Sequence, residues 1–143
     1  MPNDNFVKNY SPFELFALFG DFGNNINLES ANTFAITPDG SRIISCNSNS
    51  DRQINVWDIH TKNLLHTLEA HSDEVYCIAI APDGKKIVSG SGDRTVKVWD
   101  LRTRWLLRTL EGHSDSVRSV ATTPDGGKVV SGSVDRTIKI WDI

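Results

Sequence analysis

The sequence is poor in the residues that build disulfide frameworks and metal sites. Its 143 residues include only two cysteines, Cys46 and Cys77, and each lies within an apolar, strand-like run. Two cysteines at this separation form neither a zinc-ligand spacing nor a disulfide framework. We therefore interpret both as small buried hydrophobic residues of a protein in a reducing compartment. We expect a cytoplasmic protein with no metal.

Long hydrophobic runs are also missing. The first ten residues, MPNDNFVKNY, carry acidic and amide side chains where a signal peptide would carry basic residues followed by an apolar stretch. The most apolar early segment, Phe13–Phe19, contains Glu14 and is far too short to cross a bilayer. The sequence therefore predicts no membrane span.

No charge of either sign dominates. The 15 basic and 18 acidic residues leave a net charge of −3, which does not favour nucleic acid or an anionic membrane as a partner. The sequence has no glycine-rich phosphate loop and no paired-carboxylate cleft motif, so we expect no cofactor. Its hydrophobic content of 38% instead indicates a folded domain.

What the sequence has in abundance is repetition, with a period of 42 residues. Tryptophans, histidines and prolines recur at this spacing: Trp57, Trp99 and Trp141; His71 and His113; Pro82 and Pro124. A fixed period of this length is typical of proteins built from one repeated supersecondary unit.

The repetition divides the chain into three units and a leading segment. Residues 60–101 and 102–143 match at roughly 25 of 42 positions. A weaker copy occupies residues 24–59 and has two extra residues in its CNSNSD turn. Residues 1–23 lie outside the repeats. They match the repeat poorly, so we expect either a strand that closes the last unit or a short helix.

Within a unit the hydrophobic pattern is that of β-strands. Val75–Ala81 is a continuous apolar run, as expected of a strand covered on both faces. The sequence Pro-Asp-Gly then favours a tight turn. Two further short runs follow, KKIVSGS and TVKVWDL, with the turn GDR between them, and WLLRTLEGH reads as a fourth strand. Short strands separated by turn signals predict an all-β repeat protein.

These motifs together resemble the WD-repeat family of β-propellers. Gly-His, Pro-Asp-Gly, Ser-Gly-Ser-x-Asp and Trp-Asp occur at the family's spacing in both complete units. The resemblance covers about residues 24–143. It implies an all-β fold, a partial propeller of about three four-stranded antiparallel blades that does not close into a ring. The third unit ends after its Trp-Asp pair and lacks its last strand.

Each complete unit also contains the histidine, serine and aspartate of a hydrolytic triad. The resemblance implies instead a buried structural hydrogen-bond network, and the chemistry agrees, because an enzyme needs one nucleophile in one cleft and not a copy in every repeat. We therefore expect no catalytic residue. The predicted network residues are His71, Ser89, Asp93 and Trp99; His113, Ser131, Asp135 and Trp141; and, in the worn first unit, Ser45, Asp51 and Trp57.

The resemblance further implies an interaction platform whose contacts come from the rim of the blades. The matching partner-binding positions are Asn32, Glu74, Tyr76, Ser116 and Arg118. Tyr76 and Arg118 are the favoured pair, because tyrosine and arginine are enriched at binding hot spots. The alternative is that they only cap the rim in solvent or pack on a neighbouring blade.

Three blades cannot close a ring, since propellers need at least four. The open arc predicts either self-association that completes the ring or a fragment of a longer propeller. The predicted function is accordingly a non-enzymatic protein–protein interaction scaffold. The alternative is part of a regulatory or sensory propeller from a larger signalling protein, with little activity of its own.

Overall fold

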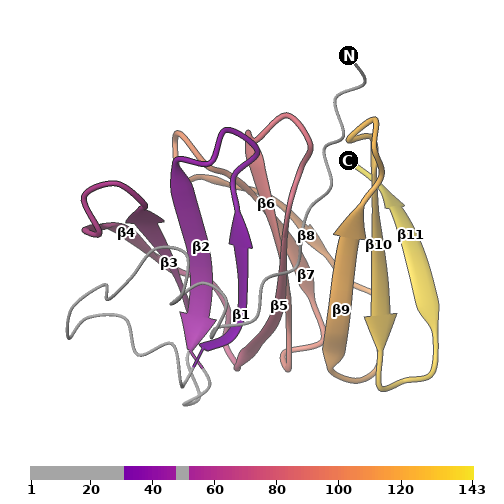
Figure 1. Cartoon of the computed structure of the whole chain (residues 1–143). Helices are drawn as coiled ribbons and strands as arrows, with labels where there is room; N and C mark the ends of the chain where they lie inside the picture. Colours follow the sequence, from indigo (N-terminus) through magenta and orange to yellow (C-terminus); the bar gives the residue numbers. More distant parts are fainter. Residues whose placement is uncertain (1–30, 48–51) are drawn as a thin grey trace.

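The computed structural model describes residues 31–47 and 52–143. Over this part of the chain the secondary structure consists of strands alone (Figure 1). The first sheet contains β1 (Ala31–Ile36), β2 (Arg42–Asn47), β3 (Gln53–Asp58) and β4 (Leu64–Glu69). The second contains β5 (Val75–Ile80), β6 (Lys86–Ser91), β7 (Val96–Asp100) and β8 (Leu106–Leu110). The third contains β9 (Val117–Thr122), β10 (Lys128–Ser133) and β11 (Ile138–Asp142).

Each sheet is an antiparallel meander in which strands adjacent in sequence pair with one another. The Pro-Asp-Gly turns set this geometry. Gly84 takes a φ of +72°, which glycine adopts without a steric penalty. Its N–H donates to the carbonyl of Ala81, and the Asp83 carboxylate accepts from the N–H of Lys85. The turn reverses the chain within a few residues, and β5 and β6 pair.

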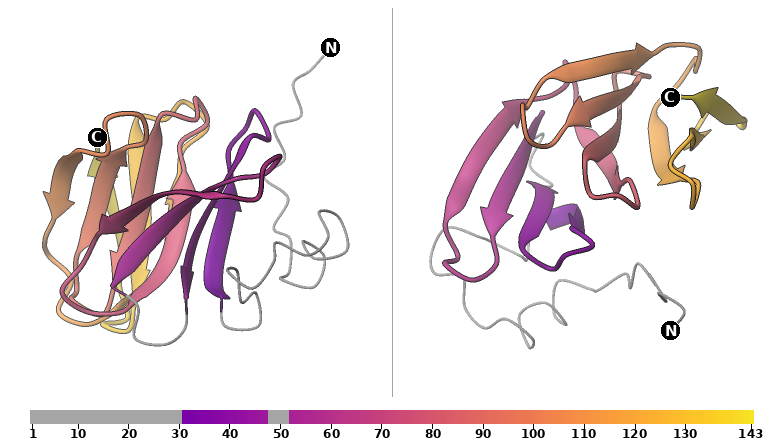
Figure 2. Two further views of the ribbon diagram at one scale, coloured as in Figure 1. Left: turned by 90° about the vertical axis from the view of Figure 1, so that its left-hand side faces the viewer. Right: turned by 90° about the horizontal axis from the view of Figure 1, so that it is seen from above.

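Apolar side chains between successive sheets form the core. One cluster joins the first sheet, through Ile44, Ile54 and Val56, to the second, through Ile87 and Trp99. An equivalent cluster joins Val88, Val96 and Val98 of the second sheet to Val117 and Val129 of the third. The sheets therefore follow one another around an arc, as the view from above shows (Figure 2).

The arc is open at the third sheet. In the second sheet, Val96 and Val98 are 0% and 1% exposed because the third sheet covers them. Ile138 and Ile140 hold the same places in the third sheet and are 75% and 67% exposed. The predictions of an all-β fold and of an incomplete ring are confirmed.

Two segments that the sequence analysis singled out are not among the described residues. The leading segment, residues 1–23, lies outside the described residues, as do residues 48–51 of the extended turn in the first unit. The described residues contain no helix long and apolar enough to cross a membrane.

Candidate functional site

The polar network of the second sheet begins with the register of two strands. Trp99 of β7 lies opposite Ile87 of β6. Side chains two residues apart point to the same face of a strand, so Ser89 shares the face of Ile87 and lies diagonal to Trp99. The indole Nε1–H donates to the Ser89 Oγ at 3.1 Å.

His71, in the loop before β5, completes the network. Its Nε2 lies 2.7 Å from the Ser89 Oγ and its Nδ1 lies 2.8 Å from the Asp93 Oδ2. An ionised carboxylate can only accept, so Nδ1 carries the proton and donates to Asp93. The Ser89 hydroxyl then donates to Nε2 while accepting from Trp99. Among the described residues, every buried side-chain nitrogen or oxygen has a hydrogen-bond partner, which is the condition for such a network to stabilise a core.

The third sheet repeats this arrangement. His113 lies 2.7 Å from the Asp135 carboxylate through Nδ1 and 2.8 Å from the Ser131 Oγ through Nε2. Trp141 donates its indole N–H to the same Oγ at 2.8 Å. The structure thus brings together all four predicted residues in both complete units.

The first sheet retains only part of the network. Trp57 donates to the Ser45 Oγ at 3.0 Å, as Trp99 and Trp141 do to their serines. The predicted third member, Asp51, lies outside the described residues.

Sequence reasoning missed a further member, the threonine that follows the Asp-Arg pair in each of the two complete units. The Thr95 hydroxyl donates to the Asp93 Oδ1 at 2.7 Å and lies 3.3 Å from the Nδ1 of His71. Thr137 does the same for Asp135 at 2.6 Å. The signal was present in the sequence, because Asp-Arg-Thr recurs in both complete units.

The network aspartates are stronger acids than usual. Partial burial raises the pKa of Asp93, but hydrogen bonds from His71 and Thr95 outweigh it and hold the pKa well below its ordinary 3.8. The Thr137 hydroxyl is the largest influence lowering the pKa of Asp135, and it acts with the His113 ring against partial burial. Since these folded-state pKa values lie below the unfolded value, the stability from each carboxylate is present above about pH 4 and is lost as the pH falls through the folded pKa.

The hydrogen-bond order aspartate–histidine–serine is that of a hydrolytic triad, but the surroundings do not suit catalysis. Ser89 is fully buried, and the indole of Trp99 donates to the oxygen that would attack a substrate. A nucleophile must instead face a cleft beside an oxyanion hole. Burial also raises the pKa of the Cys77 thiol to about 12, so it is protonated at neutral pH. Among the described residues, no group of side chains is arranged to hold a metal ion.

Two of the five predicted rim residues, Tyr76 and Arg118, meet at the junction of the second and third sheets. Arg118, near the start of β9, places its guanidinium carbon 3.7 Å from the centre of the Tyr76 ring on β5. Arginine over an aromatic face at this distance is a cation–π contact. Arg118 remains exposed, and Tyr76 is half-buried. The two favoured rim residues therefore contact each other across neighbouring sheets.

Backbone hydrogen bonds hold the rest of this rim. The carbonyl of Glu74 accepts from the N–H of Gly92, and that of Ser116 accepts from the N–H of Val134. These bonds tie the entrance of each first strand to the turn between the second and third strands of the same sheet. The fifth predicted position, Asn32, lies in β1 of the first sheet, the strand that packs against β5.

Three antiparallel meander sheets follow one another around an open arc, and each sheet contains a tryptophan–serine hydrogen bond. This arrangement defines an incomplete β-propeller. The chain matches the family model described as WD domain, G-beta repeat, at residues 27–58, 62–100 and 104–142. These matches cover more than half of the chain, so it belongs to the WD-repeat family, and the resemblance seen in the sequence is confirmed. Members of this family are generally non-enzymatic scaffolds for protein interactions.

Individual relatives share only part of their length with this chain. The protein groucho of Drosophila melanogaster is 41% identical over 56 residues, which is 39% of this chain and 7% of that protein. The intraflagellar transport protein 122 homolog of Homo sapiens is 40% identical over 60 residues, 42% of this chain and 5% of that protein. The chain therefore spans less than a tenth of the length of these relatives.

Solved structures show the same relation. The structure of U3-55K superposes with a TM-score of 0.76 and 30% sequence identity, over 85% of this chain and 37% of that one. The crystal structure of RRP9 WD40 repeats matches with the same figures.

Proposed function

We propose that this chain is a non-enzymatic interaction scaffold that binds a protein partner at the rim between its second and third sheets. The observation that carries this proposal is the stacking of Arg118 on Tyr76. It places an exposed guanidinium and an aromatic ring at a junction where side chains from two sheets converge. Tyrosine and arginine supply a large share of binding energy at protein interfaces.

The surroundings of this pair favour a preorganised surface. Gly92 lies against it, and a Cβ built on Gly92 would be 2.9 Å from the Asp73 carboxylate and 3.3 Å from the Tyr76 ring. The backbone hydrogen bonds of Gly92 and Val134 restrain the rim further, so the rim residues have little conformational freedom to lose when a partner binds. Preorganisation of this kind raises affinity by lowering the cost of ordering.

The chemistry of the rim favours a partner that presents a carboxylate to Arg118. A guanidinium whose face is occupied by an aromatic ring still has its N–H groups free at the edge, and these groups fit a carboxylate through two parallel hydrogen bonds. Glu74, Ser116 and Asn32 extend the proposed contact surface along the rim.

A second candidate function is that of a segment in a larger regulatory or sensory propeller, with little binding of its own. This candidate is favoured by how little of each relative the chain matches, which is 7% of groucho and 5% of the intraflagellar transport protein. The two candidates differ in whether the isolated chain retains a specific partner.

Substituting Arg118 by alanine is expected to weaken capture of a rim partner by about tenfold or more, the effect typical of a hot-spot residue. The measurement is quantitative affinity capture from a cell extract, followed by titration of the purified partner. Tyr76→Ala should have a similar effect, because it removes the surface on which the guanidinium rests. Arg118→Ala should change stability little, since the cation–π contact of an exposed arginine contributes about 0.5–1 kcal/mol.

The matched control is Lys85→Ala, which removes an exposed positive charge from the Pro-Asp-Gly turn at the other end of β5. It should leave capture unchanged. Proteins retained equally by wild type, Arg118→Ala and Tyr76→Ala would reject the rim as the binding surface. A wild-type chain that retains no specific protein would favour the second candidate function.

A further inference from the structure

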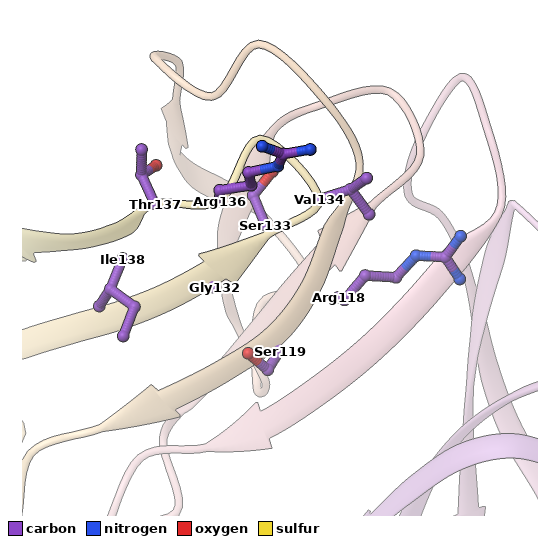
Figure 3. Close-up of a pocket in the computed structure, with 8 residues that line it drawn as sticks. All are labelled: Arg118, Ser119, Gly132, Ser133, Val134, Arg136, Thr137 and Ile138. Carbon is purple, nitrogen blue, oxygen red and sulfur yellow. The ribbon is translucent and has the colours of Figure 1, made fainter.

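The junction between the first and second sheets has described residues on both of its sides. The third sheet differs, because the hollow over Gly132 lies on the open face of that sheet (Figure 3). Basic side chains gather at the junction of the first two sheets, outside the polar networks and the rim described above. They are Arg42 at the start of β2, His66 of β4 and Arg104 in the turn before β8.

The register of the first sheet directs two of these side chains toward the second sheet. Ile44 and Val56 lie opposite each other and belong to the cluster that packs against the second sheet. His66 lies opposite Val56, and Arg42 precedes Ile44 by two residues on the same strand. Opposite residues share a face of the sheet, as do residues two apart on one strand. Arg42 and His66 therefore face the second sheet.

Arg104 approaches from the second sheet. Its backbone N–H donates to the carbonyl of Asp100 at 2.8 Å, which holds the turn. The pKa of His66 lies below its ordinary value, first because the ring is partly buried and then because the charges of Arg104 and Arg42 oppose its protonation. A backbone hydrogen bond with Leu65 acts in the opposite direction. Both guanidinium groups thus lie near one imidazole.

No carboxylate among the described residues forms an ion pair with either guanidinium. Asp39 lies near Arg42, but its carboxylate accepts hydrogen bonds from hydroxyl groups of its own turn. Asp58 lies opposite Arg42 in the register, and its carboxylate accepts from the backbone of the turn after β3. The positive charge at this junction is therefore available to an external anion.

The equivalent place at the next junction has its acceptor within the protein. Arg108 occupies the position of His66 one unit later in the sequence. Its Nη1 donates to the carbonyl of Asp142 in the third sheet at 2.9 Å. Lys128, at the start of β10, forms an ion pair with the carboxylate of the same residue. The basic side chains of that junction are thus held by the third sheet, and only the first junction leaves its guanidinium groups open.

The geometry points to a binding site for a phosphate group at this junction, formed by Arg42, His66 and Arg104. A phosphate monoester carries nearly two negative charges at neutral pH and presents three acceptor oxygens, which suits three groups that converge from two sheets. A carboxylate has only two oxygens in one plane, and a single guanidinium already satisfies both. A bound phosphate also favours the protonated imidazole, in which both ring nitrogens donate.

This site is independent of the rim. Arg42 lies at the start of β2, where the strand pairs with the end of β1. Tyr76 lies near the start of β5, at the opposite end of the sheets. The phosphate site therefore stands whether or not a partner binds the Tyr76–Arg118 stack.

Inorganic phosphate is the first probe. The purified full chain is titrated with it at constant ionic strength, and nuclear magnetic resonance follows the ring signals of the four histidines. The phosphate neutralises the two positive charges beside His66, so the pKa of this imidazole should rise by about 1 at saturation. The signal of His60, which is exposed after β3, should not respond to phosphate.

Arg104→Gly should weaken phosphate binding by about tenfold or more, because it removes charge-assisted hydrogen bonds. Residue 104 has a φ of 67°, which glycine adopts freely. The matched control is Lys62→Gly, which removes a positive charge from the equivalent turn of the first sheet, where φ is 62°. It should bind phosphate as the wild type does. Circular dichroism establishes that both variants are folded, and Arg42→Gln carries the test if Arg104→Gly is not.

A second probe, the amide of N-acetylphosphoserine, identifies the source of the phosphate group. Tighter binding of this probe than of inorganic phosphate assigns the site to a phosphorylated side chain, and equal or weaker binding assigns it to a small free phosphate. Three results would overturn the inference. They are no saturable change in the His66 signal of the folded wild type, equal weakening by Arg104→Gly and Lys62→Gly, and an equal effect of acetate at the same concentration.

Discussion

Replacing Ser89 by alanine is expected to lower the free energy of unfolding by about 2–4 kcal/mol, because it leaves two buried polar groups without a partner. The Ser89 hydroxyl accepts from the indole N–H of Trp99 and donates to the Nε2 of His71, at 3.1 and 2.7 Å. The site is fully buried, so water cannot replace the lost oxygen. Urea denaturation followed by tryptophan fluorescence measures the change.

Ser72→Ala is the matched control for this substitution. Ser72 is exposed, and the hydrogen bond that links it to the network comes from its backbone N–H, which donates to Asp93. That bond survives the loss of the hydroxyl, so the free energy of unfolding should change by less than about 0.5 kcal/mol. Similar losses for the two serines would mean that the buried hydroxyl has no special structural role.

The substitution Gly90→Val should destabilise the protein by about 3 kcal/mol or more, at the upper end of what overpacking costs. An added Cβ would lie 2.6 Å from the Cys77 Sγ and 2.7 Å from the Val117 Cγ1. Both neighbours are buried, and Val117 belongs to the next sheet. The third sheet would have to move away from the second, which exposes the apolar cluster between them.

Gly132→Val makes the same change at the equivalent position of the third sheet, on which no other described sheet packs. Its Cβ meets only the Ser119 side chain, whose hydroxyl can rotate away. We expect a change in the free energy of unfolding of less than about 1 kcal/mol, since this open face has room for a side chain. If the two substitutions lowered the free energy of unfolding equally, the destabilisation would arise within a sheet and not from the packing of one sheet on the next.

Much of the fold could be predicted from the sequence because the determinants are local and repeated. The Pro-Asp-Gly turns fix where each chain reversal falls, and the period-two pattern fixes which residues face the core. The recurrence of Trp57, Trp99 and Trp141 at 42-residue intervals then sets the unit. These features do not depend on contacts between distant residues.

The contacts between sheets could not be predicted in the same way. That Arg118 rests on Tyr76, or that Val117 fills the space over Gly90, depends on how one sheet is rotated and shifted against the next. This arrangement is the sum of many apolar contacts and leaves no pattern in either strand alone. Thr95 was missed for a different reason, because a threonine beside a tight turn is common enough to pass as turn chemistry.

The most direct test of the central claim, that the repeated aspartates hold each blade together, is the free energy of unfolding of Asp93→Ala beside that of Arg94→Ala. Asp93 accepts from His71 and Thr95, so its loss should lower stability by about 1–3 kcal/mol. The neighbouring Arg94 is exposed at the turn, and alanine there should change stability by less than about 0.5 kcal/mol. Equal losses for the two variants would contradict a structural role for the network.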